Sequence, residues 1–300
     1  MDELIAKLGE LVKGEIKVAE PMAKHTTFEI GGPAQVFVEA TCVQDIQNTV
    51  ITCAESGVDL HVLGAGSNLL VNDAGIDGIV LHLGECFANI VVQNNYINVQ
   101  AGATNEAVAK VACEAGLSGY EFASGIPGTV GGAAIMNAGA YDGEFKDVAI
   151  EVACVNGDGK VIMLNAEMAD WGYRHSRMME EGLIVVSARL KLAPKDPAEI
   201  QAAMDDLRKR REDKQPLELP SAGSTFKRPE GYFAGKLIQD ADMQGHTVGG
   251  AQVSLKHAGF VVNFDGATAS DVLGVIRDVQ DAVFKMEGVR LEPEVRMWGF

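Results

Sequence analysis

Apolar residues recur at helical spacing in several separate segments of this chain. Leu4, Leu8 and Leu11 stand on one face of a helix predicted over 3–12. A capping box of Thr41 with Gln44 predicts the start of a second helix, and Gly57 marks its end. Further helices are predicted behind Thr104 with a stop at Gly116, over 198–214, and behind Thr268 or Ser270 with a stop at Gly288.

Other apolar runs have the length and the flanking turn residues of β-strands. Two hairpins are predicted, one pairing 89–93 with 96–100 around Asn94-Asn95 and one pairing 151–155 with 160–164. Hairpins with occasional helices, in place of a steady alternation of strand and helix, indicate an α+β fold class. Single strands are predicted over 26–33, where a Gly-Gly-Pro turn ends the segment, and over 35–40, 58–63, 184–192, 251–254 and 260–263.

The composition is that of a globular protein with a sizeable core. The chain has 300 residues, of which 47% are hydrophobic and 22% charged, and Pro194 and Pro197 suggest a domain boundary near 194. Lys and Arg total 25 against 42 Asp and Glu, which gives a formal net charge of 25 − 42 = −17. This balance argues against a partner bound along a nucleic-acid backbone, but it leaves room for a small anionic ligand.

Cysteine usage and the N-terminus predict a cytoplasmic protein. The five cysteines are odd in number and form no CxxC pair, so reduced thiols are expected. The opening Met1-Asp2-Glu3 is unlike a signal peptide, and no apolar run is long enough to span a bilayer. The six histidines are scattered without an HExxH motif, so no metal site is expected.

The first of two glycine-rich stretches is Gly64-Ala65-Gly66-Ser67-Asn68-Leu69. It lacks the third glycine of the GxGxxG fingerprint, because that position is Leu69, and a strand follows where a helix should begin. A Rossmann NAD dehydrogenase is therefore not expected. The turn could still cradle a pyrophosphate with its backbone N–H groups and the Ser67 and Asn68 side chains. An ordinary strand-to-strand turn is the alternative.

The second stretch, SGIPGTVGGAAIMNAGA over 124–140, carries no charged residue. Glycine and alanine allow a backbone to lie against a flat or densely polar ligand. Such a stretch suits a large cofactor whose phosphates need N–H donors and whose ring needs an apolar bed. Tight packing between a helix and a strand is the alternative interpretation.

Seven motifs follow one another along the chain. They are HTTFEIGGPA (25–34), LGAGSNLLV (63–71), GIPGTVGGAAIMNAGAY (125–141), YRHS (173–176), AGSTFKRP (222–229), AGKLI (234–238) and LEPEVRMWG (291–299). In this order, they make the chain resemble the UDP-N-acetylenolpyruvoylglucosamine reductases, flavoenzymes that make UDP-N-acetylmuramic acid for peptidoglycan. The resemblance covers essentially the whole chain. It implies a vanillyl-alcohol-oxidase-type (PCMH-type) FAD-binding fold over 28–193, after a lead-in over 1–27, and a C-terminal α+β domain over 194–300 that binds the UDP-sugar.

By this resemblance, both glycine-rich stretches hold FAD non-covalently, and NADPH is the co-substrate. His25 and His61 are candidates for covalent flavin attachment, but hydrogen-bonded structural histidines are the favoured interpretation. The residues expected to contact FAD are Gly64, Ala65, Gly66, Ser67, Asn68, Leu69, Ser124, Gly128, Thr129, Gly132, Asn137, Ala138 and Gly139.

The resemblance also implies three catalytic residues. Arg174 matches an arginine whose planar fork suits the substrate carboxylate, and Ser224 matches a serine that protonates the carbanion formed by hydride transfer. Glu294 is expected to act protonated, as a hydrogen-bond donor, because a carboxylate would repel the growing negative charge. Without the resemblance, Arg174 is a surface arginine and Ser224 a turn residue. Substrate contacts are expected from Tyr173, Arg211, Lys214, Arg228 and His257.

The chain departs from the long form of this family. It has Arg228 where that form has asparagine, and 233–252 leaves no room for an inserted loop that carries a tyrosine. It thus resembles the shorter form, expected as a monomer or weak homo-oligomer without nucleic-acid or membrane partners. Two alternatives stay open: a flavin-dependent alcohol oxidase of the same fold, which consumes oxygen without NADPH, and a nucleotide-sugar binding module, which purifies colourless.

Overall fold

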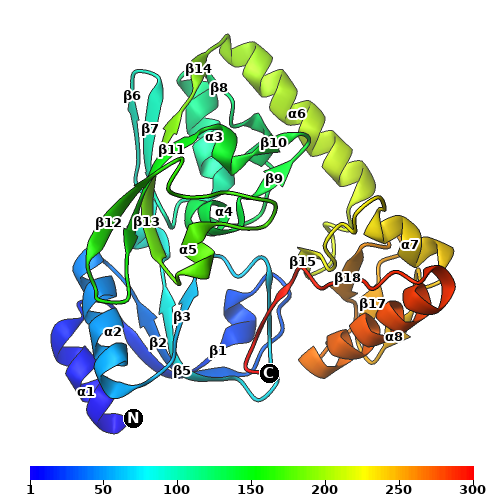
Figure 1. The fold of residues 1–300 in the computed structure, drawn as a ribbon, viewed down its shortest axis with the longest axis horizontal. Helices are drawn as coiled ribbons and strands as arrows, with labels where there is room; N and C mark the ends of the chain where they lie inside the picture. The colour runs from blue at the N-terminus through cyan, green and yellow to red at the C-terminus, as the bar shows by residue number, and fades with distance from the viewer. The chain divides into compact units, whose positions relative to one another are not determined.

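The computed structural model describes all 300 residues, which form two compact units. Unit 1 comprises residues 1–18, 36–65 and 78–210, and unit 2 comprises the remaining segments 19–35, 66–77 and 211–300 (Figure 1). Unit 1 continues beyond 194 because Ile200 and Met204 of helix α6 (Pro197–Lys214) are buried in its core. The functional ranges 28–193 and 194–300 stay predictions.

A four-stranded sheet with the order β1-β2-β5-β3 opens the fold, and helices α1 and α2 pack together beside it (Figure 1). Leu8 of α1 and Ile46 of α2 share one apolar core with Val36, Val38 and Leu81 of the strands. Both helices were predicted. The elements are α1 (Asp2–Leu11), β1 (Ile16–Pro21), β2 (Pro33–Glu39), α2 (Val43–Ser56), β3 (Leu60–Leu63) and β5 (Ile76–His82).

The predicted capping box of α2 is wrong. Its N-cap is Cys42, which makes no side-chain cap hydrogen bond, and Gln44 donates instead to Asn48. The Thr41 N–H and hydroxyl both donate to the carboxylate of Asp45, at 2.8 and 2.7 Å. The end of the helix is as predicted, because Gly57 takes the left-handed conformation with φ +62°.

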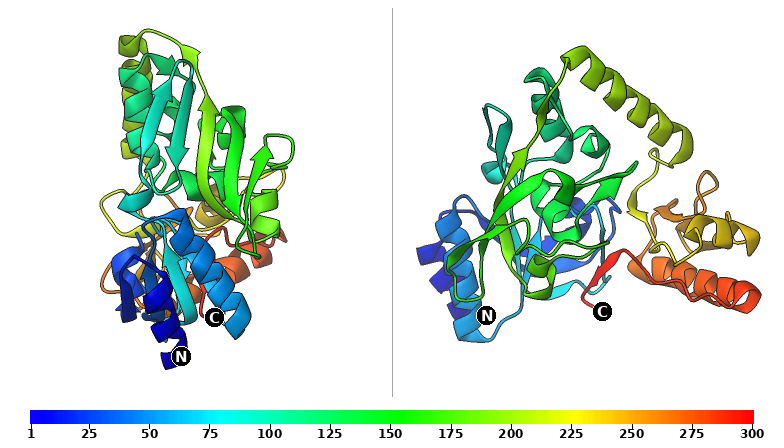
Figure 2. Two further views of the ribbon diagram at one scale, coloured as in Figure 1. Left: turned by 90° about the vertical axis from the view of Figure 1, so that its left-hand side faces the viewer. Right: turned by 45° about the horizontal axis from the view of Figure 1, so that its top comes forward.

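The larger sheet of unit 1 is antiparallel, with the order β12-β11-β13-β7-β6. It contains both predicted hairpins, which are visible in Figure 2. Thr104 caps α3 as predicted, since its hydroxyl accepts from the Ala107 N–H at 3.1 Å. The elements are β6 (Ile90–Gln93), β7 (Tyr96–Gln100), α3 (Asn105–Glu114), β11 (Ala149–Val155), β12 (Val161–Asn165) and β13 (Ile184–Lys191).

The second glycine-rich stretch contains a short helix that the sequence did not predict, α4 (Val130–Met136), and this helix contacts β13 and β7. Smaller elements complete unit 1. They are β8 (Leu117–Ser118), β9 (Gly139–Ala140), β10 (Gly143–Glu144), α5 (Arg177–Glu180) and β14 (Ala193–Pro194).

Unit 2 is built on an antiparallel sheet with the order β15-β18-β17-β16, against which α8 packs (Figure 1). Val272, Val279 and Val283 of α8 are fully buried in its core, and Thr268 caps this helix in a capping box with Asp271. The elements are β4 (Leu69–Val71), β15 (Ser221–Ser224), α7 (Ala234–Asp240), β16 (Thr247–Val248), β17 (Ala251–Val253), β18 (Phe260–Asn263), α8 (Ala269–Glu287) and β19 (Arg296–Trp298).

Two predictions for unit 2 are wrong. Ser224, which its own sequence context predicts as a turn residue, ends the edge strand β15 (Ser221–Ser224). The segment 26–30, expected as a strand, is irregular and follows a 3-10 turn over Met22–His25. The Thr26 hydroxyl closes that segment on itself by donating to the carbonyl of Ile30 at 3.0 Å, which replaces a ladder hydrogen bond to a neighbouring strand.

Candidate active site

Within unit 1, the two glycine-rich stretches meet at Gly64 and Thr129. A Cβ atom on Gly64 would lie 2.5 Å from the Thr129 hydroxyl oxygen, so only glycine permits this approach. Thr129 is buried, whereas Gly132 is exposed. The nearest atom to a Cβ placed on Gly132 would be the Thr129 hydroxyl oxygen, at 4.0 Å. The structure therefore brings three of the predicted cofactor residues together and leaves one side of them open.

Buried polar contacts anchor the second stretch from beneath. The Val130 and Gly131 N–H groups donate to the carbonyls of Ala103 and Ala101, at 2.9 and 2.8 Å. Asn105, fully buried, donates its side-chain amide to the Gly128 carbonyl at 3.3 Å and accepts from the Tyr120 hydroxyl at 2.8 Å. Neither Asn105 nor Tyr120 was among the predicted site residues.

The position of Asn105 on its helix could have identified it from the sequence as a buried residue with a structural role. Asn105 begins the stripe that continues through Val108, Ala109 and Ala112, all of which are buried. A polar residue on an apolar stripe must find hydrogen-bond partners in the core. In this case, the partners are the loop that would carry the cofactor and the Tyr120 hydroxyl, whose pKa burial raises.

The end of the second stretch is fixed by Asn137. This fully buried residue has a left-handed backbone, with φ +43°. Its amide donates to Glu144 at 3.2 Å and to the Gly172 carbonyl at 3.0 Å, while its oxygen accepts from the Lys146 N–H at 3.0 Å. The Asn137 side chain thus ties the stretch to the segment that carries Tyr173 and Arg174. Ser124 and Gly139 also make internal contacts, to the Glu121 carbonyl and to the Gly143 backbone.

Arg174 is held in a strained position beside this network. Its φ of +52° costs a non-glycine residue about 1 kcal/mol, and such strain is concentrated at functional sites. The guanidinium carbon lies 5.1 Å from the Tyr173 ring centroid. The hydrogen bond from Lys146 is the main cause that lowers the pKa of Glu144, and the charge of Arg174 adds to it. The carboxylate of Glu144, which no sequence pattern pointed to, therefore interacts electrostatically with Arg174.

Within unit 2, the second half of the first stretch is tied to the segment that carries Glu294. Asn68 donates its amide to the Glu294 carbonyl at 3.3 Å and accepts from the Arg296 N–H at 2.9 Å. Leu69, buried at the start of β4, pairs in parallel with Arg296 of β19. Gly66, with φ +60°, packs on the backbone of His25 so closely that a Cβ would come within 2.1 Å of the His25 carbonyl oxygen.

Ser224 and Glu294 are linked through one backbone hydrogen bond. The Glu294 N–H donates to the carbonyl of Thr225 at 2.8 Å, and Thr225 is itself buried with its N–H donating to the Gly259 carbonyl at 2.9 Å. Ser224 is exposed at the end of β15, where it pairs with Phe260. Two predicted catalytic residues therefore lie on adjacent, hydrogen-bonded segments. Glu292, two residues before Glu294, is exposed and forms an ion pair with Lys227 at 3.1 Å.

Four of the predicted substrate residues, Arg211, Lys214, Arg228 and His257, lie in unit 2. Burial and then the charge of Lys214 lower the pKa of His257, so its imidazole is neutral at pH 7 and Lys214 lies near it. His257 Nδ1 accepts from the Gly259 N–H at 3.1 Å, which leaves Nε2 as its second polar atom. Arg211 is half-buried three residues before Lys214. Arg228 is exposed, and its guanidinium carbon lies 4.0 Å from the Phe233 ring centroid.

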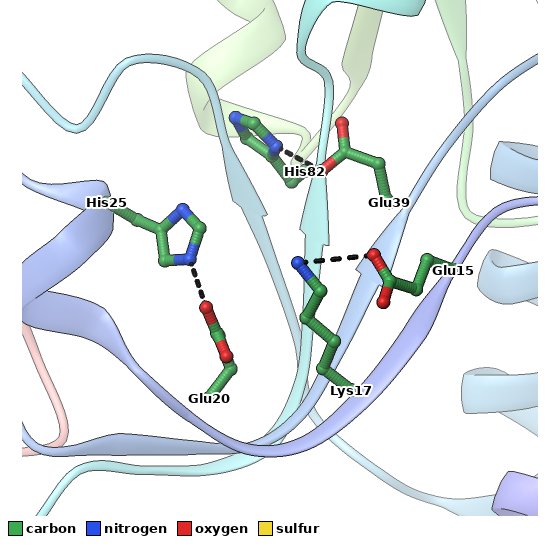
Figure 3. Close-up of polar contacts among 6 residues, drawn as sticks. All are labelled: Glu15, Lys17, Glu20, His25, Glu39 and His82. Carbon is green, nitrogen blue, oxygen red and sulfur yellow. Dashed lines mark hydrogen bonds and ion pairs between the residues drawn. The ribbon is translucent and has the colours of Figure 1, made fainter.

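The two histidines considered for flavin attachment have different surroundings. In unit 2, His25 Nε2 lies 2.9 Å from Glu20, as Figure 3 shows. His61 lies on β3 in unit 1. Burial lowers the pKa of its imidazole, although the negative charge of Asp59 acts to raise it. The same figure shows two ion pairs of unit 1, His82 with Glu39 at 2.6 Å and Lys17 with Glu15 at 3.2 Å (Figure 3).

The donors at these loops fit FAD. The stretches 64–69 and 124–139 contain no acidic side chain, and they offer backbone next to glycines, hydroxyls and one open glycine. Such a donor set suits a pyrophosphate and a planar ring. Gly64 and Gly66 of the first stretch also permit close packing, on the Thr129 hydroxyl and on the His25 backbone. No group of three or more His, Cys, Asp or Glu side chains is arranged to hold a metal ion.

Comparison with known proteins gives the class first. Residues 34–165 match the FAD binding domain family, and residues 215–298 match the family described as UDP-N-acetylenolpyruvoylglucosamine reductase, C-terminal domain. An alkyldihydroxyacetonephosphate synthase structure, 15% identical, matches 65% of this chain with a TM-score of 0.50 and supports the fold alone. The protein is an FAD-binding oxidoreductase with a PCMH-type domain, and the predicted fold class is confirmed.

Full-length relatives define the family. The UDP-N-acetylenolpyruvoylglucosamine reductase of Agathobacter rectalis is 52% identical over 292 residues, covering 93% of each chain. That of Limosilactobacillus fermentum is 48% identical and covers 100% of this chain and 98% of its own. The crystal structure of the Thermus caldophilus enzyme, 34% identical, covers 95% of this chain and 99% of its own, with a TM-score of 0.82.

The chain belongs to the family of UDP-N-acetylenolpyruvoylglucosamine reductases, FAD- and NADPH-dependent enzymes of peptidoglycan precursor synthesis. The resemblance seen in the seven motifs is therefore confirmed. No helix of the structure has both the length and the apolar character needed to cross a membrane.

Proposed function

We propose that this chain reduces UDP-N-acetylglucosamine enolpyruvate to UDP-N-acetylmuramate, with NADPH as the reductant. The observation that carries this proposal is the hydrogen bond from the Glu294 N–H to the Thr225 carbonyl at 2.8 Å, which holds Glu294 beside Ser224. FAD held by the stretches 64–69 and 124–139 would supply the redox chemistry, namely hydride transfer between NADPH and the methylene carbon of the enolpyruvyl group. The side chains of the protein then stabilise the developing negative charge and donate a proton.

Ser224 is the proposed proton donor. When hydride adds to the methylene carbon, the electron pair of the double bond moves to the neighbouring carbon and its carboxylate. The Ser224 hydroxyl gives its proton to that carbon, which forms the C–H bond of the lactyl ether, and the alkoxide regains a proton from water. A serine suffices because an enolate-like carbanion is a strong base. The exposure of Ser224 at the end of β15 supports this role, since a substrate can reach it.

Arg174 and Glu294 are proposed to stabilise the charge that builds on the carboxylate. A planar guanidinium can donate two parallel hydrogen bonds to a carboxylate, and its orientation beside Glu144 and Tyr173 restricts its motion in advance. Glu294 acts in its protonated form and donates one further hydrogen bond. Tyr173, which is exposed, is proposed to contact the substrate next to Arg174.

Arg211, Lys214 and Arg228 are proposed to bind the UDP pyrophosphate, and His257 the sugar. A neutral imidazole with Nδ1 already engaged can donate from Nε2 to a sugar oxygen. Lys256 supports this arrangement, because its ammonium donates to the Glu212 carbonyl at 2.6 Å and joins the end of α6 to the loop before His257.

FAD is proposed to bind non-covalently through residues 64–69 and 124–139, in a functional domain spanning 28–193, with the UDP-sugar domain spanning 194–300. The protein is further proposed to act in the cytoplasm as a monomer or weak homo-oligomer, on NADPH and the nucleotide sugar alone. Five cysteines without a disulfide support the reducing compartment.

The proposal is tested on the purified protein. Acid precipitation should release yellow FAD into the supernatant, and NADPH consumption without oxygen should require UDP-N-acetylglucosamine enolpyruvate. Oxygen consumption with an alcohol and no NADPH would instead indicate an oxidase of the same fold. A colourless protein that binds the nucleotide sugar and takes up no added FAD would indicate a binding module.

A further inference from the structure

We propose that Phe233, stacked on Arg228, forms the platform on which the pyrimidine base of the nucleotide-sugar substrate stacks. This inference rests on the proposed function and assigns a specificity-determining residue to the same site. Phe233 was not among the residues expected to contact the substrate. Its role follows from the exposure of an aromatic side chain that is stacked on Arg228, on a loop whose backbone is fixed and which leads to the residues proposed to bind phosphate and sugar.

Phe233 is 61% exposed, and its neighbour Tyr232 is 46% exposed. Hydrogen bonds to backbone groups nevertheless fix the loop that carries them, which precedes α7. The Tyr232 N–H donates to the Pro229 carbonyl at 3.1 Å, and Arg228 Nε donates to the Tyr232 carbonyl at 3.3 Å. The Phe233 carbonyl accepts from the N–H groups of Lys236 and Leu237 in the first turn of α7. The backbone of this loop is therefore held in place while the Phe233 side chain stays open to solvent.

Arg228 is stacked on one face of the Phe233 ring. Its guanidinium carbon lies over the ring, 4.0 Å from the centroid, a stacking distance for a cation on an aromatic face. Proteins stack nucleobases on guanidinium planes and on aromatic rings. The pair is thus a two-layer stack with one positive charge, and a base that adds to this stack would bring its anionic diphosphate close to that charge.

The platform lies beside His257. Gly235, two residues after Phe233, has no side chain, and a Cβ there would lie 3.3 Å from the His257 imidazole. Gly259 is equally close to that imidazole, and its carbonyl binds the N–H of Thr225, which follows Ser224. Lys214 acts electrostatically on the same imidazole. One short run of contacts therefore connects the stacking surface, a cation for phosphate, the proposed sugar ligand and the proposed proton donor.

Isothermal titration of the holoenzyme with UDP and with inorganic pyrophosphate separates the base from the phosphates. Phe233→Ala should bind UDP roughly tenfold more weakly, as expected for one lost base stack, and should bind pyrophosphate as the wild type does. Phe233→Leu should resemble Phe233→Ala, and Phe233→Tyr should retain UDP binding. In turnover, the KM for UDP-N-acetylglucosamine enolpyruvate should rise with kcat little changed.

The matched control is Phe264→Ala. Phe264 is 55% exposed in the same unit. It follows β18, which runs away from Ser224, because the first residue of β18 pairs with Ser224 and its third residue pairs with Ser221. This variant should bind UDP normally. Unchanged UDP affinity in Phe233→Ala, or an equal loss of pyrophosphate affinity, would overturn the platform while leaving the proposed function intact. A wild-type holoenzyme that neither binds UDP nor reacts with the enolpyruvyl substrate would overturn both.

Discussion

The regions proposed for the cofactor and for the substrate are built in opposite ways. In unit 1, the stretch 124–139 is fixed by buried side chains, since the amides of Asn105 and Asn137 both donate hydrogen bonds to backbone or side-chain partners inside the protein. In unit 2, the segments 221–233 and 292–294 are fixed by backbone hydrogen bonds, and Ser224, Arg228 and Phe233 stay exposed.

This difference indicates that backbone groups recognise the ligand in the cofactor region, whereas side chains recognise it in the substrate region. A loop that is braced from beneath offers its backbone to a ligand, which suits phosphates and a permanent cofactor. Segments held by their backbone free their side chains for a substrate that must enter and leave. Substitutions of Asn105 and within the stretch 124–139 should therefore affect stability and flavin binding. Substitutions of Ser224, Arg228 and Phe233 should affect catalysis or substrate binding with little loss of stability.

The largest expected effect is that of Ser224→Ala. Flavin bleaching by NADPH should persist, and reoxidation by the enolpyruvyl substrate should slow by about a thousandfold, because the carbanion loses its proton donor. Anaerobic stopped-flow absorbance measures both half-reactions. Ser221→Ala, on the same strand, should leave both rates close to those of the wild type. Equal slowing of both half-reactions in Ser224→Ala would mean that Ser224 is structural.

The next effect is expected for Asn105→Ala, which removes the support of the second stretch. The Tyr120 hydroxyl loses its buried acceptor and the Gly128 carbonyl loses a donor, so the free energy of unfolding should fall by about 3 kcal/mol. FAD should bind more weakly in parallel. Urea denaturation and flavin titration measure the two quantities. Asn165→Ala removes only an exposed contact to Met168 and should leave both unchanged.

A smaller loss is expected for Gly64→Ala, which tests the contact between the two stretches. The new methyl group would meet the Thr129 hydroxyl at 2.5 Å, and overpacking of this kind costs about 2 kcal/mol in unfolding free energy. Adding Thr129→Ala removes the clashing atom and should restore most of the loss. Gly157→Ala, with no atom within 4 Å, is the control. If the double variant is as unstable as Gly64→Ala, the two stretches do not meet in this way.

The smallest effect concerns pH. Burial lowers the pKa of His61 in the folded state, so the unfolded chain takes up a proton more readily. The contribution of His61 to the free energy of unfolding is complete above the unfolded-state pKa of about 6.5. As the pH falls below that value, this contribution is lost, by at most about 1.4 kcal/mol per pH unit. His61→Gln should flatten the decline of stability between pH 6.5 and 5. A steeper decline in this variant would contradict the assignment.

The sequence predicted elements whose signals are local. The hairpin at Asn94, the cap at Thr104 and the stop at Gly57 each depend on a few adjacent residues, and all three are confirmed. The capping box at Thr41 failed for a long-range reason. Asp45 accepts from the N–H of Lys13, 32 residues away, as well as from Thr41, and this network displaces a local cap.

Helix α4 shows why the rest could not be predicted. Gly131 and Gly132 disfavour a helix, so tertiary contacts must stabilise it. Val130 and Gly131 donate to Ala103 and Ala101 at its start, while the Trp171 indole and the Ser176 hydroxyl donate to the carbonyls of Ala134 and Ile135 at its end. Residues more than 25 positions away thus determine the helix. Similarly, the family motifs pointed to Ser224 and Glu294, but only the structure shows the Thr225 carbonyl that joins their segments.

The most direct measurement is an anaerobic double-mixing experiment on the wild-type protein, followed at the visible absorbance band of the flavin. The account predicts that NADPH bleaches the flavin and that one equivalent of UDP-N-acetylglucosamine enolpyruvate then restores the colour, whereas UDP-N-acetylglucosamine does not. A flavin that stays bleached with the enolpyruvyl substrate and regains its colour only on exposure to oxygen would contradict it.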